Sequence, residues 1–414
     1  MPSDSVISTG GLMPFLGRPY TDEPADDARF TPAERLRHRC EHEVRNQPVD
    51  LSEYDTDGRA STRLEQELRV IHTLGLDDFF LALHDLYQFA RSRGHIALIN
   101  GPAIGSVVAH RLGFSPVNPV RHRLPFERHL DAGRTFPPVQ QLFVSGDGLD
   151  ELAVGFRREY GFPEPEVSEP AFQTYSRDWH PPSGGKSGRA AIEVVEHPGL
   201  GVIARATQLV RDRHGADAIP DGLPENDTET MAVFRCGETD NVFGFGGCEI
   251  MEVLIRSTPG GIDDLAAVLA VTSSVAAGDA LDEWLDGRSE APQHPNADVE
   301  DVLHPTRGVL LYHEQVMELV HRVAGLDPVD GMRLVKLMWK RDAEGIAEFR
   351  HRFVTGARGR EVEVIEADGV FDLIARRGTI TVCKANALTT ALVGYQIAWL
   401  KTHFPDEFKA AVGS

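Results

Sequence analysis

The sequence has no long hydrophobic run, few cysteines and a shortage of positive charge, and each of these excludes a class of protein. The longest apolar stretch, residues 265–277, is interrupted by Thr272, Ser273 and Ser274, so it is too short to span a bilayer. The four cysteines form no Cys-x-x-Cys pair, which favours reduced thiols over a disulfide framework. The N-terminus lacks the basic and apolar regions of a signal peptide. Together these absences predict a soluble cytoplasmic protein without a membrane partner.

Acidic residues outnumber basic ones by 63 to 42, for a formal net charge of −21. This balance disfavours non-specific binding to a polyanion, since affinity for nucleic acid comes mainly from Lys and Arg at phosphates. One window, residues 333–360, is nevertheless basic, and within it only Asp342, Glu344 and Glu348 oppose the cations. Two interpretations carry equal weight: a solvated helix face or a polyanion-binding surface. The cations of this window are Arg333, Lys336, Lys340, Arg341, Arg350, Arg352, Arg358 and Arg360.

With 414 residues, the chain has room for two to three domains or one multi-lobed core. Apolar periodicity predicts a helix starting near Thr31, two helices joined near Gly75, a helix from Tyr312 to a C-cap at Gly325, and a last helix over residues 387–401. Residues 95–99 read as a buried strand. Residues 1–30 are rich in Gly, Pro and Ser and predict a mobile arm, and residues 162–188 predict a loop or a domain junction.

Three short patterns suggest ligand chemistry, each beside a plainer interpretation. Gly101, Gly105 and Ser106 lie between a predicted strand and helix, where main-chain N–H groups can bind a phosphate, although such a turn often only redirects the chain. His38, Cys40 and His42 contain metal-ligating atoms, but only the two histidines share a helix face, so a solvated surface is favoured. Residues 185–187 read Gly-Lys-Ser without the earlier Walker glycine or a preceding strand, which predicts a loop and no P-loop.

Read in order, several segments resemble the alpha subunit of bacterial DNA polymerase III, a C-family DNA polymerase. Residues 64–94 are similar to the helices before its palm, and residues 101–134 to its glycine-serine turn, helix and FERFL segment. Residues 148–161 resemble the helix after the catalytic strand, and residues 219–254 the fingers segment whose core is GDT-x-GVFQ-x-ES. Three further segments complete the series, GVLLYHEQVMELVHRVAG, LMWKRDAEGIAEFRHRFVTGA and GYQIAWLKTHFPDEFKAA.

The resemblance implies a two-metal nucleotidyl transfer in which aspartates hold two Mg²⁺ ions. The family's acidic strand reads PDxDxD, and the corresponding run here reads PPVQQL, with Gln140 and Leu142 at two aspartate positions. An amide is a weak neutral ligand and leucine has no ligating atom. Glu196 is the candidate for the third acidic position, but one carboxylate does not hold two metals. Mg²⁺ is thus the cofactor that the family implies and that these residues support poorly.

Other positions depart from the family as well. The glycine-serine turn has Asn100 at its arginine position and Pro102 at its first serine. Of the family's cationic runs, Lys340 and Arg341 remain behind Trp339, and Lys384 remains from FNKSH. With Gly101, Gly105 and Ser106, these three cations are the candidate ligand or phosphate-binding residues. The resemblance also implies that the PHP domain, part of the palm, and the OB-fold and sliding-clamp-binding regions are missing.

The expected fold is α+β and mostly helical, with a reduced palm and a helical fingers lobe. The expected division is a flexible arm over residues 1–30, a reduced palm and thumb-like region over residues 31–195, and a fingers-like domain over residues 196–414. The leading hypothesis is a pseudo-polymerase that binds nucleic acid, nucleotide, a polymerase inhibitor or a replisome partner. The alternatives are a repurposed ATP- or nucleotide-using transferase or ligase, and a residual DNA polymerase that recruits Asp147, Asp150 and Glu196.

Overall fold

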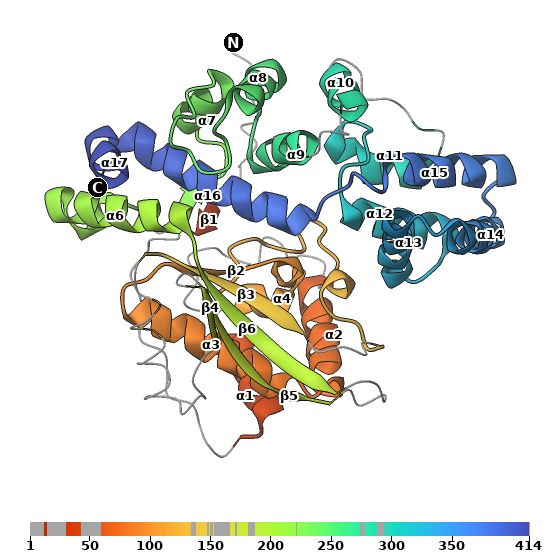
Figure 1. Cartoon of the computed structure of the whole chain (residues 1–414), viewed down its shortest axis with the longest axis horizontal. Helices are drawn as coiled ribbons and strands as arrows, with labels where there is room; N and C mark the ends of the chain where they lie inside the picture. The colour runs from red at the N-terminus through yellow and green to blue at the C-terminus, as the bar shows by residue number, and fades with distance from the viewer. Residues whose placement is uncertain are drawn as a thin grey trace, which may run out of the picture.

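The structure is a computed structural model of the whole chain. It describes residues 12–14, 30–42, 59–133, 138–146, 149, 152, 166–169, 172–180, 187–220, 222–273, 278–287, 294 and 296–413. Figure 1 shows a sheet with helices packed along it in one half of the molecule. A long helix, α16 (Lys384–His403), crosses above the sheet with α6, α7, α9 and α17 beside it, and α11–α15 form a separate group on one side. The architecture is α+β and mostly helical with a small mixed sheet, as the sequence predicts.

The central sheet has five strands in the order β2-β3-β6-β5-β4. The β3–β6 pair is parallel, whereas β2–β3, β5–β6 and β4–β5 are antiparallel. A second sheet pairs the short strands β1 and β7. The strand bounds are β1 Leu12–Pro14, β2 Ala97–Asn100, β3 Val139–Val144, β4 Glu166–Glu169, β5 Phe172–Trp179, β6 Gly188–Glu196 and β7 Gly222–Pro224.

In the helices that precede β3 in the sequence, the predicted start near Thr31 and the predicted junction at Gly75 are both present. In α1, the Glu34 carboxylate accepts a hydrogen bond from the Thr31 main-chain N–H at 2.8 Å, and the Thr31 hydroxyl accepts one from the Glu34 N–H at 3.3 Å, which forms a capping box. Gly75 has φ +63° between α2 and α3. The bounds are α1 Pro32–His42, α2 Arg59–Thr73, α3 Asp77–Ser92, α4 Val107–Arg111 and the 3₁₀ helices η3 Pro102–Gly105 and η4 Phe126–Arg128.

Helices after the sheet form the second half of the molecule. Gly325 ends α12 with φ +66°, which confirms the predicted C-cap. The bounds are α6 Pro198–His214, η5 Ala216–Ala218, α7 Thr228–Arg235, α8 Cys248–Ser257, α9 Ile262–Thr272, α10 Gly278–Asp286, α11 Ala297–Leu303, η7 His304–Thr306, α12 His313–Ala324, α13 Pro328–Lys340, α14 Ala343–Gly359, α15 Val364–Arg377, α16 Lys384–His403 and α17 Pro405–Val412.

Two hydrophobic cores hold these elements. The larger core joins the sheet and α1–α4 to α6–α9 and α16, and the smaller one lies among α11–α15. Residues from both sides of position 195 contribute to the larger core, for example Ile192 and Ile203. The predicted division at residues 195 and 196, and the arm over residues 1–30, stay predictions.

Two sequence interpretations of the region before β6 were wrong. Residues 162–188 were expected to form a loop, but β4 and β5 lie within them, and Tyr175 and Trp179 of β5 are buried. A strand therefore does precede the Gly-Lys-Ser run. That run joins the antiparallel strands β5 and β6, so no helix follows it and it is still no P-loop.

The remaining sequence expectations concern thiols and membranes. Cys236, Cys248 and Cys383 are free thiols, as predicted. Among the residues that the structure describes, no helix is long and apolar enough to cross a bilayer.

Candidate functional site on the central sheet

Side chains along β3 alternate between a buried face and a partly exposed face of the sheet. Gln140 is 2% exposed and Leu142 is fully buried, and successive strand residues point to opposite faces. Gln140 Nε2 donates hydrogen bonds to the main-chain oxygens of Asn100 at 2.7 Å and Gln141 at 2.9 Å. The two positions matched to metal-binding aspartates therefore face the core. If the alignment to the family's acidic strand is shifted by one residue, the two aspartate positions fall on Val139 and Gln141, whose side chains point to the outward face.

A polar row crosses this outward face. The backbone register places Asn100 of β2 opposite Gln141 of β3, and Gln141 opposite Glu193 of β6. Asn100 Nδ2 donates to Gln141 Oε1 at 3.0 Å, and Gln141 Nε2 donates to Glu193 Oε2 at 3.2 Å. Sequence reasoning missed this row as a unit. The available signal was Glu193, a charged residue between the apolar residues Ile192 and Val194.

Glu196, the candidate third acidic residue, lies away from this row. It ends β6 opposite Val144, and paired residues of neighbouring strands point to the same face. Val144 shares the buried face of Leu142. Glu196 and Glu193 are three residues apart on one strand, so they face opposite sides of the sheet. The structure does not bring Glu196 together with Gln141 and Glu193.

Three aromatic rings pack together at tilted angles at the end of the outward face. The His197 ring centroid lies 4.8 Å from that of Phe143 and 4.5 Å from that of Phe243. Burial lowers the pKa of His197 to about 4, so its imidazole is neutral at pH 7, and its Nδ1 accepts the Leu200 N–H at 3.3 Å. This end of the face is therefore apolar and carries no cation from His197.

The polar row does not fit a two-metal centre. Mg²⁺ prefers carboxylate oxygens and water in octahedral geometry, and the row offers two amides and one carboxylate. Among the described residues, no group of three or more His, Cys, Asp or Glu side chains is arranged to hold a metal ion. Asp147 and Asp150, the other candidate acids, lie outside the described residues. No step of a metal-dependent reaction is derived for this face.

The glycine-serine turn begins a helix whose first N–H groups are already satisfied. Ser106 is the N-cap of α4, and its Oγ accepts the Ala109 N–H at 3.1 Å. The carboxylate of Glu67, on α2, accepts the N–H groups of Val107 and Val108, each at 3.0 Å, and the Ser106 hydroxyl at 2.7 Å. Only 1% of Glu67 is exposed. The chain's own carboxylate thus occupies the place where an anion binds at a helix N-terminus.

Arg63 completes this arrangement. Its Nε donates to Glu67 Oε1 at 2.9 Å, and its Nη2 donates to the main-chain oxygen of Gly105. A Cβ on Gly105 would lie 3.1 Å from the Pro125 oxygen, so the turn is tightly packed. Gly101 adopts φ +88°, a conformation that glycine favours. Burial raises the pKa of Glu67, while Arg63 and the three donors act in the opposite direction. Phosphate binding by Gly101, Gly105 and Ser106 stays a prediction.

The three candidate cations lie in different surroundings. Lys384 begins α16, and its Nζ donates to the main-chain oxygen of His122 at 2.8 Å and lies 5.7 Å from the centroid of the Tyr312 ring. Lys340 and Arg341 are exposed at the end of α13, where Arg341 adopts φ +53°. The contacts of Lys384 therefore hold it against the segment before η4. A shared phosphate site for the three stays a prediction.

The basic window contains internal ion pairs. Arg333 and Arg352 both contact Asp330, at 2.8 and 3.0 Å. Arg350 contacts Asp368 and Asp372, at 2.9 and 2.8 Å. The sequence view that only acids inside the window oppose its cations was therefore incomplete, because these partners lie before and after it. Three of the eight cations of the window are therefore ion-paired within the chain.

A loop before η4 joins the sheet to the later helices through consecutive basic residues. Arg121 pairs with Glu225, and His122 Nδ1 lies 3.0 Å from Asp263 Oδ1. Arg123, with φ +51°, contacts Asp301 at 2.9 Å. Burial raises the pKa of Asp263, but His122, Lys384 and Arg121 together hold it well below its usual value. The loop thus ties two halves of the molecule by charge.

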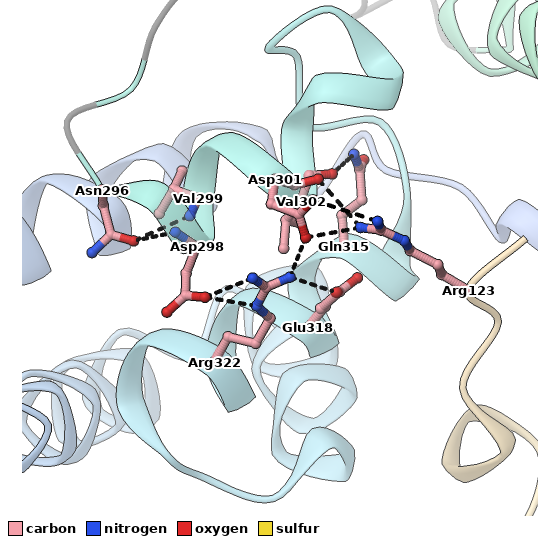
Figure 2. Close-up of polar contacts among 9 residues, drawn as sticks. All are labelled: Arg123, Asn296, Asp298, Val299, Asp301, Val302, Gln315, Glu318 and Arg322. Carbon is pink, nitrogen blue, oxygen red and sulfur yellow. Dashed lines mark hydrogen bonds and ion pairs between the residues drawn. The ribbon is translucent and has the colours of Figure 1, made fainter. Parts of the chain in front are cut away.

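Figure 2 shows how the Arg123 contact continues into the helical half. Arg322 of α12 donates from Nε and Nη2 to Asp298 Oδ1, at 2.9 and 2.6 Å, and from Nη1 to Asp301 at 2.5 Å and Glu318 at 3.2 Å. A planar guanidinium suits this arrangement because it presents several donors in fixed directions. Asp301 is therefore shared between two arginines from distant parts of the sequence.

Two family models match the chain over separate regions. Residues 34–162 match the bacterial DNA polymerase III alpha NTPase domain, and residues 199–361 match the bacterial DNA polymerase III alpha subunit finger domain. Both models describe parts of one class of protein, the bacterial replicative polymerase subunits.

Curated relatives agree with this class. The chain is 23% identical to DNA polymerase III subunit alpha of Halalkalibacterium halodurans, over 96% of the chain and 44% of that protein. It is 32% identical to DNA polymerase III subunit alpha of Pseudomonas aeruginosa over 46% of the chain and 17% of that protein. It is 25% identical to an error-prone DNA polymerase of Pseudomonas savastanoi pv. phaseolicola over 84% of the chain and 44% of that protein.

The chain spans less than half the length of each of these relatives. Their similarity and the two matching family models confirm the resemblance found in the sequence. The chain is a DNA polymerase III alpha-like protein.

Proposed function

We propose that this chain is a pseudo-polymerase, a DNA polymerase III alpha-like protein that acts by binding and does not transfer nucleotides. One observation carries the proposal. On the outward face of β2, β3 and β6, the polar row consists of Asn100, Gln141 and Glu193, which offers one carboxylate. Two-metal nucleotidyl transfer requires ligands that hold two divalent ions beside the attacking and leaving oxygens.

The ligand that this chemistry favours is not the DNA backbone. Arg333, Arg350 and Arg352 are ion-paired within the chain, and the helix N-terminus at the glycine-serine turn holds the Glu67 carboxylate. With a net charge of −21, the whole molecule repels a polyanion. The proposal is therefore that the protein binds a replisome protein or a polymerase-directed small molecule.

The test is a primer-extension assay with Mg²⁺ and then Mn²⁺, with anisotropy of the same labelled primer–template read in parallel at low salt. The expected result is no extension and no saturable, salt-sensitive binding. Glu193→Gln and Glu196→Ala are prepared beside the wild type. Extension by the purified wild type that disappears in either variant would overturn the proposal in favour of a residual polymerase.

Two other outcomes point elsewhere. Tight binding of primer–template without extension would support a pseudo-polymerase that binds nucleic acid, and would contradict the choice of ligand made above. Turnover of ATP or a dNTP without a primer would support a transferase or ligase, with Lys340, Arg341 and Lys384 as the triphosphate ligands to substitute first.

A further inference from the structure

A cavity of about 550 Å³ lies between the sheet half and the helical half of the molecule. Its walls come from α2, from the segment after Leu124 that includes η4, and from the start of α13. This volume lies within the range of small-molecule sites, which is roughly 300–1,000 Å³. The cavity is separate from the polar row on the outward face of the sheet.

The cations of the cavity wall are already engaged. Arg63 donates to Glu67 and to the Gly105 main-chain oxygen, and Arg333 Nη1 donates to Asp330 Oδ1 at 2.8 Å. Each arginine is thus paired with a carboxylate of the chain, and the wall carries three further carboxylates, those of Glu127, Asp131 and Asp327.

The carboxylates of the wall retain accepting capacity. Asp327 Oδ1 accepts the Val329 N–H at 2.9 Å as the N-cap of α13, and Asp131 Oδ1 accepts the Gly133 N–H at 2.9 Å. A carboxylate has about four acceptor positions on two oxygens, so each keeps its second oxygen for a ligand. Glu127, also in the wall, is exposed.

Apolar side chains supply the rest of the surface. Phe126 and Leu130 of the wall are buried, and Val70 and Val329 are half-buried. A ligand that fits this lining has an apolar body and a group that donates hydrogen bonds or carries positive charge. A phosphate or a nucleotide has the opposite requirement, because its oxygens need donors.

We infer that this cavity binds a small organic cation with an apolar body, whose amine, amidine or guanidine contacts Asp131, Asp327 and Glu127. The site lies between α2 and α13, so an occupant would contact both halves of the molecule. Such an occupant stabilises the folded state by mass action. The inference does not rest on the loss of catalysis, since its residues are not those of the polar row.

The test uses three probes of one shape and different charge. Benzamidine, benzamide and benzoate are titrated onto the full chain by saturation-transfer NMR and by calorimetry. The expected result is saturable binding of benzamidine, and no saturable binding of benzamide or benzoate. Preferential binding of benzoate, or no saturable binding of any probe, would overturn the inference.

Variants locate the binding. Asp131→Asn with Asp327→Asn keeps the side-chain oxygens that accept the Gly133 and Val329 N–H groups, because asparagine is a good N-cap. The expected effect is at least a tenfold weaker affinity for benzamidine. Asp342→Asn is the matched control, since Asp342 is also an N-cap, accepting the Gly345 N–H at 3.0 Å, but lies outside the cavity wall. It should leave the affinity unchanged.

Two results would contradict the location or the chemistry. Equal affinity of wild type and the double variant would place benzamidine elsewhere. Displacement of benzamidine by Mg²⁺ or Ca²⁺ at low concentration would show a metal site. Primer extension tests the proposed function separately, so failure of one leaves the other standing.

Discussion

Glu67 connects α2 to the first turn of α4 by a set of buried hydrogen bonds. Glu67→Ala leaves two main-chain N–H groups, the Ser106 hydroxyl and Arg63 without this acceptor. Removing one partner of a buried charged pair costs roughly 3–5 kcal/mol, so we expect the free energy of unfolding to fall by about that amount in urea titrations.

Glu65→Ala on the same helix is the control. Glu65 pairs with Arg37, and about half of its side chain is exposed, so the loss should stay below about 1 kcal/mol. Equal losses in the two variants would show that Glu67 is no more than a surface carboxylate in solution.

Buried histidines predict a stability that declines in acid. Burial lowers the pKa of His110, His197 and His313 to about 4, from an ordinary value of 6.5. Between these values the unfolded state binds more protons than the folded state, so the free energy of unfolding decreases as pH falls from 6.5 towards 4. For His110 alone the decrease between pH 7 and pH 5 is about 2 kcal/mol.

Urea unfolding at pH 7 and pH 5 measures this difference. His110→Gln should lose less stability across the interval than the wild type, whereas His351→Gln, at an exposed position on α14, should behave like the wild type. A wild type whose stability is the same at both pH values would contradict the burial of these imidazoles.

At this scale the sequence predicted the glycine-serine turn but not what fills it. Ser106 and Glu67 are 39 positions apart, and Gln141 and Glu193 are 52 apart. Such contacts depend on the tertiary fold, so local patterns do not contain them. Gln140 and Leu142, the positions aligned with the family's aspartates, face the core. Their neighbours in the strand face outward, because a shift of one residue in a strand exchanges its two faces.

Helix α13 packs against α12 through a glycine. A Cβ built on Gly331 lies 2.6 Å from Met317 Cα and 2.9 Å from Met317 N, which are main-chain atoms that move only with the helix. We expect Gly331→Ala to lower the free energy of unfolding by roughly 1–3 kcal/mol, since overpacking forces such shifts. Gly369→Ala on α15 meets nothing within 4 Å and should be neutral or raise stability by up to about 1 kcal/mol.

Thermal or urea unfolding of the two variants tests the packing of α12 on α13. The close packing at Gly331 would be contradicted if Gly331→Ala had the stability of the wild type while Gly369→Ala was destabilised. Because α13 also carries part of the cavity wall, benzamidine binding by Gly331→Ala reports whether the helix has moved.

At the scale of elements, the long periodic helices were predictable and two strands were not. Residues 312–325 show apolar positions at helical spacing and a glycine at the end, and the structure has α12 capped by Gly325. Strands β4 and β5 lie in a stretch rich in Pro, Gly and Ser, which hides the alternation of their side chains. β5 is a strand because it pairs with β6 along its whole length, a contact that composition does not reveal.

The two halves of the molecule are joined by packing and by charge. The larger hydrophobic core packs the sheet and α1–α4 against α6–α9 and α16, whereas α11–α15 have a smaller core of their own. The loop with Arg121, His122 and Arg123 adds charge pairs between the halves. The sequence similarity to DNA polymerase III alpha covers residues of both halves, while the net charge of −21 and the ion-paired arginines Arg333, Arg350 and Arg352 disfavour a nucleic-acid ligand. This combination underlies the proposal of binding without catalysis.

The measurement that tests this account most directly is a titration of Mn²⁺ onto the purified chain, followed by electron paramagnetic resonance. The comparator is the double variant Asn100→Asp with Gln141→Glu, which gives the polar row three carboxylates, Glu193 included. We predict no saturable Mn²⁺ site in the wild type and at least one in the double variant, because three charged carboxylates bind a divalent ion far more strongly than one carboxylate beside two neutral amides. Saturable binding of two Mn²⁺ ions by the wild type would contradict the pseudo-polymerase account.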